Sequence, residues 1–232
     1  ISPSGSKGFT WNVVTGCLRD CRAPGGKESY CYARRIARRF GKTKAERNFE
    51  PTFHPERQYE PSLRRKPVTI FMGSMTDLFG PWAPDEWIWT VLQEVVSCRR
   101  HVFLLLTKYP ERYKEFNPWP SNCWLGASAT NGNTWWAGKH HLSRVEWEDG
   151  KRRSFISLEP LLGPVVSMEG CPAPPVQWLI VGAQTPGRFI LVTRERMGDA
   201  WGYAQTHSIP LFIKDSLYVE GMPRDLPYLE VP

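Results

Sequence analysis

Short apolar runs recur along this chain, and longer mixed segments separate them. Runs that are nearly continuous in apolar character are typical of strands buried on both faces of a sheet. None of them approaches the roughly 20 residues that a membrane helix needs, so we expect a protein with no membrane contact. The sequence predicts seven strands, over residues 9–14, 68–72, 101–107, 123–128, 154–158, 178–181 and 210–213.

Helical segments lie between several of these runs. Residues 31–40 are rich in Ala and Arg and contain neither Pro nor Gly. Pro84 and two acidic residues begin a second segment, in which apolar residues follow at helical spacing. Residues 110–116 fit a short helix, and Thr193 is a candidate cap for another that runs to about residue 206. Buried strands that alternate with helices predict an α/β fold with mainly parallel strands, and we expect a partial or complete (β/α) barrel rather than a doubly wound sheet.

The 232 residues, of which 41% are hydrophobic, suit a single domain. We expect the barrel to occupy residues 9–215, with a loop of special interest over 16–32. Residues 1–8 contain Ser, Gly and Lys instead of an apolar signal run, and we expect a disordered or non-native start there. Residues 216–232 form a Pro-containing tail. Without a visible secretory signal, the expected location is the cytoplasm.

Three of the six cysteines lie within fifteen residues, at Cys17, Cys21 and Cys31. A chain with this much apolar material does not need disulfides for stability, so a cluster of thiolates in a reducing compartment explains the grouping better. Three thiolates hold three irons of a [4Fe–4S] cluster and leave the fourth iron open to a substrate or cofactor.

Zinc is the alternative metal for these thiolates. Three cysteines and one histidine make a common closed site, and His54 or His101 is then the candidate fourth ligand. On that interpretation the protein is a zinc-binding module for nucleic acid without catalytic activity. The other cysteines, at Cys98, Cys123 and Cys171, have no ligand-like spacing, and burial is expected for them.

The cysteine loop resembles that of the radical S-adenosylmethionine (SAM) superfamily. The superfamily pattern is Cys-x3-Cys-x2-Cys with an aromatic residue before the last cysteine. Here the first spacing and Tyr30 match, while the second gap is seven residues longer. More specifically, the chain resembles uncharacterised phage and bacterial proteins with a three-cysteine motif. The matching stretches are TWNVVTGC (10–17), CYARR (31–35), HPER (54–57), MTDLF (75–79), LTKYPER (106–112), WLGAS (124–128), SLEPLLGP (157–164) and IVGA (180–183).

This resemblance implies a partial β/α barrel that binds a [4Fe–4S] cluster and SAM. It implies an enzyme in which one electron cleaves SAM to methionine and a 5′-deoxyadenosyl radical, and the radical then takes hydrogen from a substrate. A reductant such as flavodoxin or ferredoxin supplies the electron. The substrate itself is not indicated.

Residues that follow the predicted strands, all of them polar except one glycine that allows close backbone approach, are the candidates for SAM binding. Parallel strands of a barrel end at one edge, where the loops carry the chemistry. Each candidate also has a structural interpretation, as a helix cap, a turn residue or a partner in an ion pair. The candidates are Ser74, Asp77, Lys108, Ser128, Thr130, Asn131, Glu159 and Gly182.

Four arginines follow the cysteine loop, at Arg34, Arg35, Arg38 and Arg39. They form two i,i+4 pairs on the expected helix, and like charges at that spacing repel each other. The formal net charge of the chain is +7. Nucleic acid or a nucleotide is therefore the favoured anionic partner or substrate, and a solvated basic face is the alternative.

Overall fold

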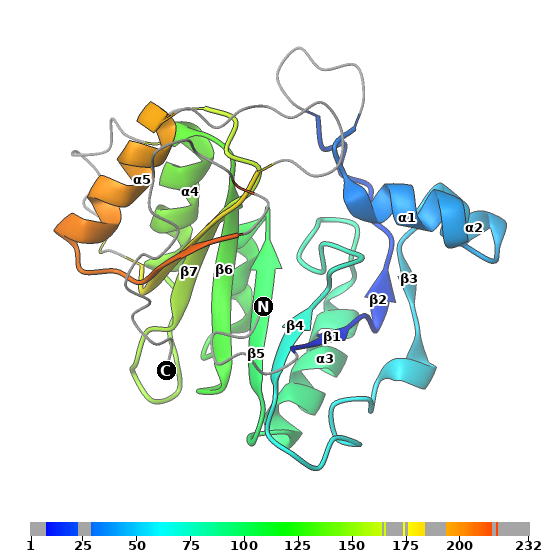
Figure 1. Cartoon of the computed structure of the whole chain (residues 1–232). Helices are drawn as coiled ribbons and strands as arrows, with labels where there is room; N and C mark the ends of the chain where they lie inside the picture. Colours follow the sequence, from blue (N-terminus) through cyan, green and yellow to red (C-terminus); the bar gives the residue numbers. More distant parts are fainter. Residues whose placement is uncertain are drawn as a thin grey trace.

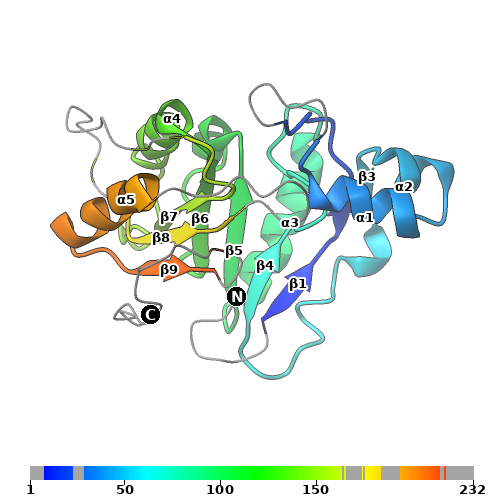
Figure 2. The ribbon, with the colours of Figure 1, turned by 45° about the horizontal axis from the view of Figure 1, so that its top comes forward.

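Seven parallel strands form the central sheet of the computed structural model, which describes residues 8–22, 29–163, 165, 174, 176–183, 194–214 and 217. The sheet curls into a half-barrel, with β1 at one edge and β9 at the other (Figure 2). The predicted α/β fold is confirmed, in its partial-barrel form. The strands in spatial order are β1 (Phe9–Trp11), β4 (Thr69–Met72), β5 (Val102–Thr107), β6 (Cys123–Ala129), β7 (Ser154–Leu158), β8 (Trp178–Val181) and β9 (Leu211–Ile213).

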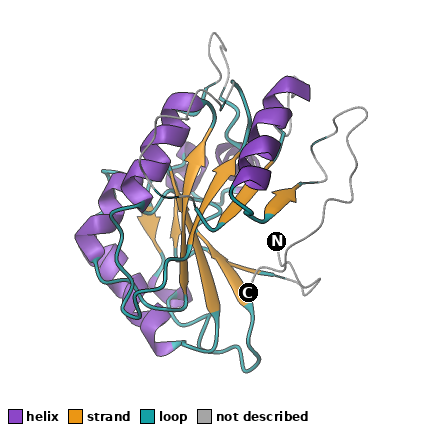
Figure 3. Ribbon diagram, turned by 90° about the vertical axis from the view of Figure 1, so that its left-hand side faces the viewer, coloured by secondary structure: helices purple, strands orange, loops and turns teal. Residues whose placement is uncertain are grey.

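Three long helices pack on the convex face of this sheet, and two more lie beyond its β1 edge. The helices on the convex face are α3 (Asp85–Ser97), α4 (Gly132–Leu142) and α5 (Arg194–Thr206), whose buried residues belong to one core with the strands. Figure 3 shows how the helices surround the sheet. The pair beyond β1 consists of α1 (Tyr32–Phe40) and α2 (Lys44–Asn48) (Figure 1). Two 3₁₀ segments, η1 (Pro55–Arg57) and η2 (Pro110–Phe116), complete the helical structure of the described residues.

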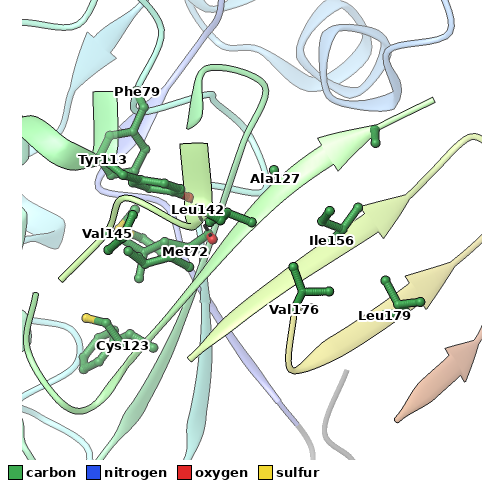
Figure 4. Close-up of a cluster of buried hydrophobic side chains, with 14 of the residues drawn as sticks. Met72, Phe79, Tyr113, Cys123, Ala127, Leu142, Val145, Ile156, Val176 and Leu179 are labelled. Atoms are coloured by element: carbon green, nitrogen blue, oxygen red, sulfur yellow. Dashed lines mark hydrogen bonds between the residues drawn. The ribbon is translucent and has the colours of Figure 1, made fainter. Parts of the chain in front are cut away.

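Side chains alternate between the two faces along each strand, and this divides the core in two. Ala127, Ile156 and Leu179 belong to the large core that the strands share with the helices (Figure 4). Trp124, Phe155, Trp178 and their neighbours Leu104 and Ile180 form a second cluster on the concave face. The concave cluster therefore gives the inside of the half-barrel an apolar lining.

The first predicted strand, 9–14, is two strands in the structure. β1 ends at Trp11, and β2 (Val14–Thr15) pairs antiparallel with β3 (Thr52–Phe53), which the apolar pattern did not predict. The break comes at Asn12, whose Oδ1 accepts hydrogen bonds from the Ser74 hydroxyl and the Met75 N–H. Asn12 thus ties the end of β1 to the loop after β4.

The boundaries of the other predicted helices and strands agree closely with those of the structure. The differences concern helices. The helix expected over 31–40 begins at Tyr32 with Cys31 as its N-cap, and residues 110–116 are a 3₁₀ segment. Helices α2 and α4 were not predicted. Among the described residues, no helix has the length and apolar character to cross a membrane. Cys171, Thr193, residues 1–7 and nearly all of the tail lie outside the described residues.

Candidate functional site

The cysteine loop begins at Gly16, a position where the backbone tolerates no side chain. Gly16 has φ +87°, and a Cβ there would lie 2.0 Å from the carbonyl oxygen of Glu50. The Gly16 N–H donates to the Met75 carbonyl at 2.9 Å, and the next N–H, of Cys17, donates to the Phe49 carbonyl at 3.0 Å. The first cysteine is therefore fixed by backbone contacts on both sides.

The long gap between the second and third cysteines is closed at its base. Tyr30 N–H donates to the Cys21 carbonyl at 2.9 Å, and the Ser29 hydroxyl donates to the same oxygen at 3.0 Å. Arg22 and Ser29 form an antiparallel bridge. The chain thus returns beside Cys21 before it reaches Cys31. The two thiols lie close enough for each to shift the pKa of the other, although nine residues separate them.

Cys31 caps helix α1 with its sulfur. The thiol accepts the N–H of Arg34 at 3.5 Å. The hydrogen bond from Cys21 and the backbone N–H groups of Arg34 and Ala33 lower the pKa of Cys31 to about 6. A helix N-terminus favours a thiolate for the same reason. In contrast, burial raises the pKa of Cys17. Of the three, Cys31 is thus the readiest metal ligand.

Two cations face the thiols, at Lys108 and Arg19. Burial lowers the pKa of Lys108, but the negative charges of Asp77 and Cys21 outweigh this effect and raise it overall. The Arg19 guanidinium packs over the Tyr109 ring at 5.0 Å. This positive charge suits three thiolates and the anionic centre they would hold. Arg22, the other arginine of the described part of this loop, pairs with Asp20 at 2.6 Å.

Three cysteines supply the kind of donor atom that an iron–sulfur cluster would need. Cys17, Cys21 and Cys31 are free thiols that line one cavity of about 120 Å³. In the described part of the chain, no group of three His, Cys, Asp or Glu side chains is arranged to hold a metal ion, and this includes the three thiols. Three thiolates without an imidazole are the soft ligands that hold [4Fe–4S] clusters.

Both histidines proposed as a zinc ligand already have protein partners. Nε2 of His54 lies 2.8 Å from the Thr15 hydroxyl, and its Nδ1 lies 3.4 Å from the Glu56 carboxylate. His101 precedes β5, at the amino edge of the sheet, and its ring nitrogens contact the Pro61 carbonyl at 3.0 Å and the Val68 N–H at 3.3 Å. Neither ring therefore offers a nitrogen to the cysteines in this arrangement.

A cavity of about 470 Å³ adjoins the thiols on the concave face. Its lining is apolar towards the amino edge of the sheet and polar towards the carboxyl edge. The strand register explains this gradient, since Phe155 pairs with Trp178 while Ser128 and Ser157 pair one step nearer the carboxyl edge. The lining includes Thr10, Cys21, Tyr30, Cys31, Tyr32, Phe71, Ser74, Leu104, Leu106, Lys108, Ser128, Phe155, Ser157, Glu159, Trp178, Ile180 and Lys214.

Four of the eight residues predicted to bind SAM line this cavity: Ser74, Lys108, Ser128 and Glu159. Ser74 contributes from the loop after β4, where its carbonyl accepts the Tyr32 hydroxyl at 2.6 Å. Thr130 lines a smaller cavity of about 100 Å³ together with Ser128 and Lys108. These residues come from several strand ends, as the barrel geometry predicts.

The other three predicted residues have structural contacts. Asp77 is buried, and its two oxygens accept the Thr107 hydroxyl at 2.5 Å and the Lys108 N–H at 2.9 Å. Asn131 is the N-cap of α4 and accepts the Thr134 N–H at 3.1 Å. A Cβ on Gly182 would lie 3.0 Å from the Glu159 carboxyl group, so this glycine makes room for Glu159.

Glu159 forms an ion pair with Lys214 at the rim of the cavity. β9 ends beside β8, and the Lys214 N–H donates to the Val181 carbonyl at 2.9 Å, which directs the residue to this edge. The two residues are 55 positions apart in the sequence, so local sequence patterns do not predict this ion pair.

Only three of the four predicted anion-binding arginines are exposed. Arg34 turns to the cysteine loop, where its Nη2 donates to the Cys17 carbonyl at 2.8 Å. Arg35, Arg38 and Arg39 remain on the surface of α1. The predicted basic patch therefore contains three arginines, because Arg34 contacts the cysteine loop instead.

Several lining residues were not predicted. Thr10, Ser157 and Trp178 lie inside strands, and Tyr32 lies in the first turn of α1. The signal available for the strand residues was the alternation of faces, since Ser157 is two positions after Phe155 and two before Glu159.

Comparison with known proteins finds a match to a family model. A family model described as a protein of unknown function (DUF5131) matches residues 7–215. No curated protein and no solved structure matches the chain.

Proposed function

The chain belongs to this family of proteins of unknown function, and from its site we propose that it is a radical SAM enzyme. On this proposal Cys17, Cys21 and Cys31 hold a [4Fe–4S] cluster, and the adjoining cavity of about 470 Å³ receives SAM and a substrate. The observation that carries the proposal is the closed base of the cysteine loop. It brings the third thiol beside the second despite the long gap, at the edge of the half-barrel where the cavity opens.

When bound, the reduced cluster supplies one electron that cleaves the sulfonium of SAM into methionine and a 5′-deoxyadenosyl radical. The residues of the chain bind and orient. Lys108 lines both the thiol cavity and the large cavity, so its ammonium can meet a carboxylate placed between them. Arg19 lines the thiol cavity from another side.

The two halves of the cavity lining have different tasks. The hydroxyls of Ser128 and Ser157 offer hydrogen bonds to the polar parts of SAM, and the Ser74 hydroxyl, which donates to Asn12, can accept one. The rings of Phe155 and Trp178 offer an apolar surface to a base or substrate and exclude water from a reactive radical.

The test is anaerobic reconstitution with iron and sulfide, followed by SAM and dithionite. We expect about four irons and four sulfides per chain, a broad visible absorbance and 5′-deoxyadenosine as a product. Cys17→Ala, Cys21→Ala and Cys31→Ala are each expected to lose both the absorbance and the product. Cys98→Ala and Cys123→Ala are the controls, because these two cysteines are fully buried in the convex core.

The same measurement separates the proposal from a zinc module. A colourless protein that purifies anaerobically with one zinc, and releases no 5′-deoxyadenosine, would overturn the proposal. If the protein binds about four irons but forms no 5′-deoxyadenosine, the proposed cluster is supported and the proposed cleavage of SAM is wrong.

A further inference from the structure

Helix α1 carries an exposed apolar stripe. Tyr32, Ile36 and Phe40 are spaced four residues apart, so they lie along one side of the helix. Their exposed fractions are 46%, 43% and 67%. Three large apolar side chains on one helix face are unusual for a surface that contacts only water.

A basic stripe runs beside the apolar one. Arg35, Arg38 and Arg39 are exposed, and the helix contains no acidic residue. The Arg39 guanidinium lies 5.1 Å from the centre of the Phe40 ring, so the two stripes touch. Charges of one sign at this density repel one another and favour an anionic partner.

This face begins at the proposed cluster. Cys31 caps α1, and nine residues of helix reach about 14 Å to Phe40. The helix lies beyond the β1 edge of the sheet, with the long helices α4 and α5 on the other side of the half-barrel (Figures 1 and 2). A molecule bound along α1 would therefore lie within about 14 Å of Cys31.

A second cavity lies next to the apolar stripe. It has a volume of about 290 Å³, and Ile36, Ala37 and Phe40 form part of its lining. Two carboxylates also line it, but both have partners. Glu46 accepts the N–H of Thr43 at 3.0 Å, and Glu50 accepts the Asn48 amide at 3.0 Å.

We propose that this face of α1 docks an acidic protein that carries one electron at a time. The inference rests on the proposed function, because cleavage of SAM consumes one electron. That electron leaves the cofactor of the carrier, which is oxidised, and enters the cluster, which is reduced. The basic stripe steers the acidic carrier to α1, and the apolar stripe holds it there.

The mixed composition favours a protein over a nucleic acid as the partner. Interfaces between proteins are enriched in aromatic residues and Arg, as this face is. A phosphate backbone is bound mainly by charged and polar groups, and the apolar side chains of Ile36 and Phe40 cannot contribute to such binding.

The first arm of the test measures binding. Reduced flavodoxin, an acidic electron carrier, is the probe, and the reconstituted protein is immobilised. We expect Arg35→Glu, Arg38→Glu and Arg39→Glu together to lower the association rate about tenfold or more at low salt. The matched control is the triple variant Arg65→Glu, Lys66→Glu and Lys151→Glu. It changes the net charge equally with exposed residues that precede β4 and β7 at the amino edge.

The second arm measures 5′-deoxyadenosine with two reductants. Dithionite is small and needs no docking face, so the α1 triple variant should keep its dithionite-driven rate. With reduced flavodoxin the same variant should lose about tenfold or more of its rate, while the control variant keeps it. Ile36→Ser with Phe40→Ser, which changes no charge, should weaken flavodoxin binding several-fold.

The outcomes separate this inference from the proposed function. Equal effects of both triple variants, or unchanged binding in the α1 variant, would overturn the docking face. If the α1 variant instead loses retention of DNA or RNA and keeps flavodoxin binding, the face serves nucleic acid and the inference is wrong. Failure of the wild-type protein to cleave SAM with dithionite would overturn the proposed function, whatever the binding arm shows.

Discussion

Arg34 donates a hydrogen bond from Nη2 to the carbonyl oxygen of Cys17 over 2.8 Å, and this contact joins the two ends of the cysteine loop. Arg34 lies in the helix that begins at the third cysteine, while Cys17 is the first. The same nitrogen reaches the Arg19 carbonyl at 3.4 Å, and the guanidinium lies over the Phe49 ring at 5.1 Å. One side chain therefore holds the relative position of the first and third proposed ligands.

Replacing Arg34 with alanine should loosen this loop. Loss of a charged donor to a backbone carbonyl is expected to lower the free energy of unfolding by about 1.5–3 kcal/mol. Iron content after reconstitution should fall as well, because Cys17 and Cys31 are no longer held together. Urea denaturation and iron analysis are the measurements. Arg38→Ala is the control on the same helix, and its exposed side chain should change stability by no more than about 0.5 kcal/mol.

Substitutions at two glycines with positive φ can distinguish the cost of backbone strain from the cost of a steric clash. Gly16 (φ +87°) would place a Cβ 2.0 Å from a backbone oxygen, while Gly150 (φ +71°) has nothing within 4 Å of that position. Gly150→Ala should cost only the strain, about 1–2 kcal/mol. Gly16→Ala should cost about 3 kcal/mol or more, since the clash adds to the strain. Thermal or urea denaturation of both variants measures the difference, and equal losses would contradict the geometry of the loop entry.

Glu148 gives the stability of the amino edge a pH dependence. The hydrogen bonds from Arg99 and from the Ser121 N–H lower the pKa of Glu148 to about 2, from an ordinary value of 4.5. A carboxylate stabilised in the folded state adds stability above pH 4.5, and this stability is lost as pH falls towards 2. Glu148→Gln should therefore cost about 0.5–1 kcal/mol at pH 7, a small value because the pair is partly exposed.

The measurement is urea denaturation of the wild type and Glu148→Gln from pH 7 to pH 3. The difference between them should stay constant down to about pH 5 and narrow below it. Glu146→Gln, at an exposed position two residues earlier, is the control. A difference that grows as the pH falls would show that the Arg99 contact does not stabilise the fold.

The parallel sheet could be predicted from sequence because buried strands read as continuous apolar runs. Residues 102–107 and 178–181 are examples, and both strands lie within one residue of the predicted limits. Helix α4 could not be predicted in the same way. It contains Gly132 and Gly138, and its start depends on the capping box of Asn131 and Thr134, a contact between side chain and backbone. The short pair β2 and β3 depends on tertiary pairing, which leaves no periodic pattern.

The sequence predicts which residues of the candidate site follow strand ends, but it does not predict which side chains these residues contact. Ser128 and Glu159 follow buried runs, so the barrel rule places them at the cavity. The partner of Glu159 could not be deduced, because Lys214 comes from the other end of the chain. The same holds for Asp77, whose oxygens are occupied by the end of β5.

The closed base of the cysteine loop predicts that residues 23–28 are dispensable for iron binding. Arg22 and Ser29 form an antiparallel bridge, and two residues are enough to connect such a pair in a tight hairpin. Replacing 23–28 with two glycines should therefore keep the contacts from Ser29 and Tyr30 to the Cys21 carbonyl. We expect the same iron and sulfide per chain as in the wild type after anaerobic reconstitution.

The control for this deletion lengthens the chain inside the closed base. Two glycines inserted between Cys21 and Arg22 shift Tyr30 away from the Cys21 carbonyl, which separates the second and third thiols. This variant should lose most of its iron even though its chain is longer. If both variants lose iron equally, residues 23–28 take part in the site. If both keep it, the pairing of Cys21 with Cys31 is not what positions the ligands, because a flexible loop would then serve as well as the hydrogen-bonded one.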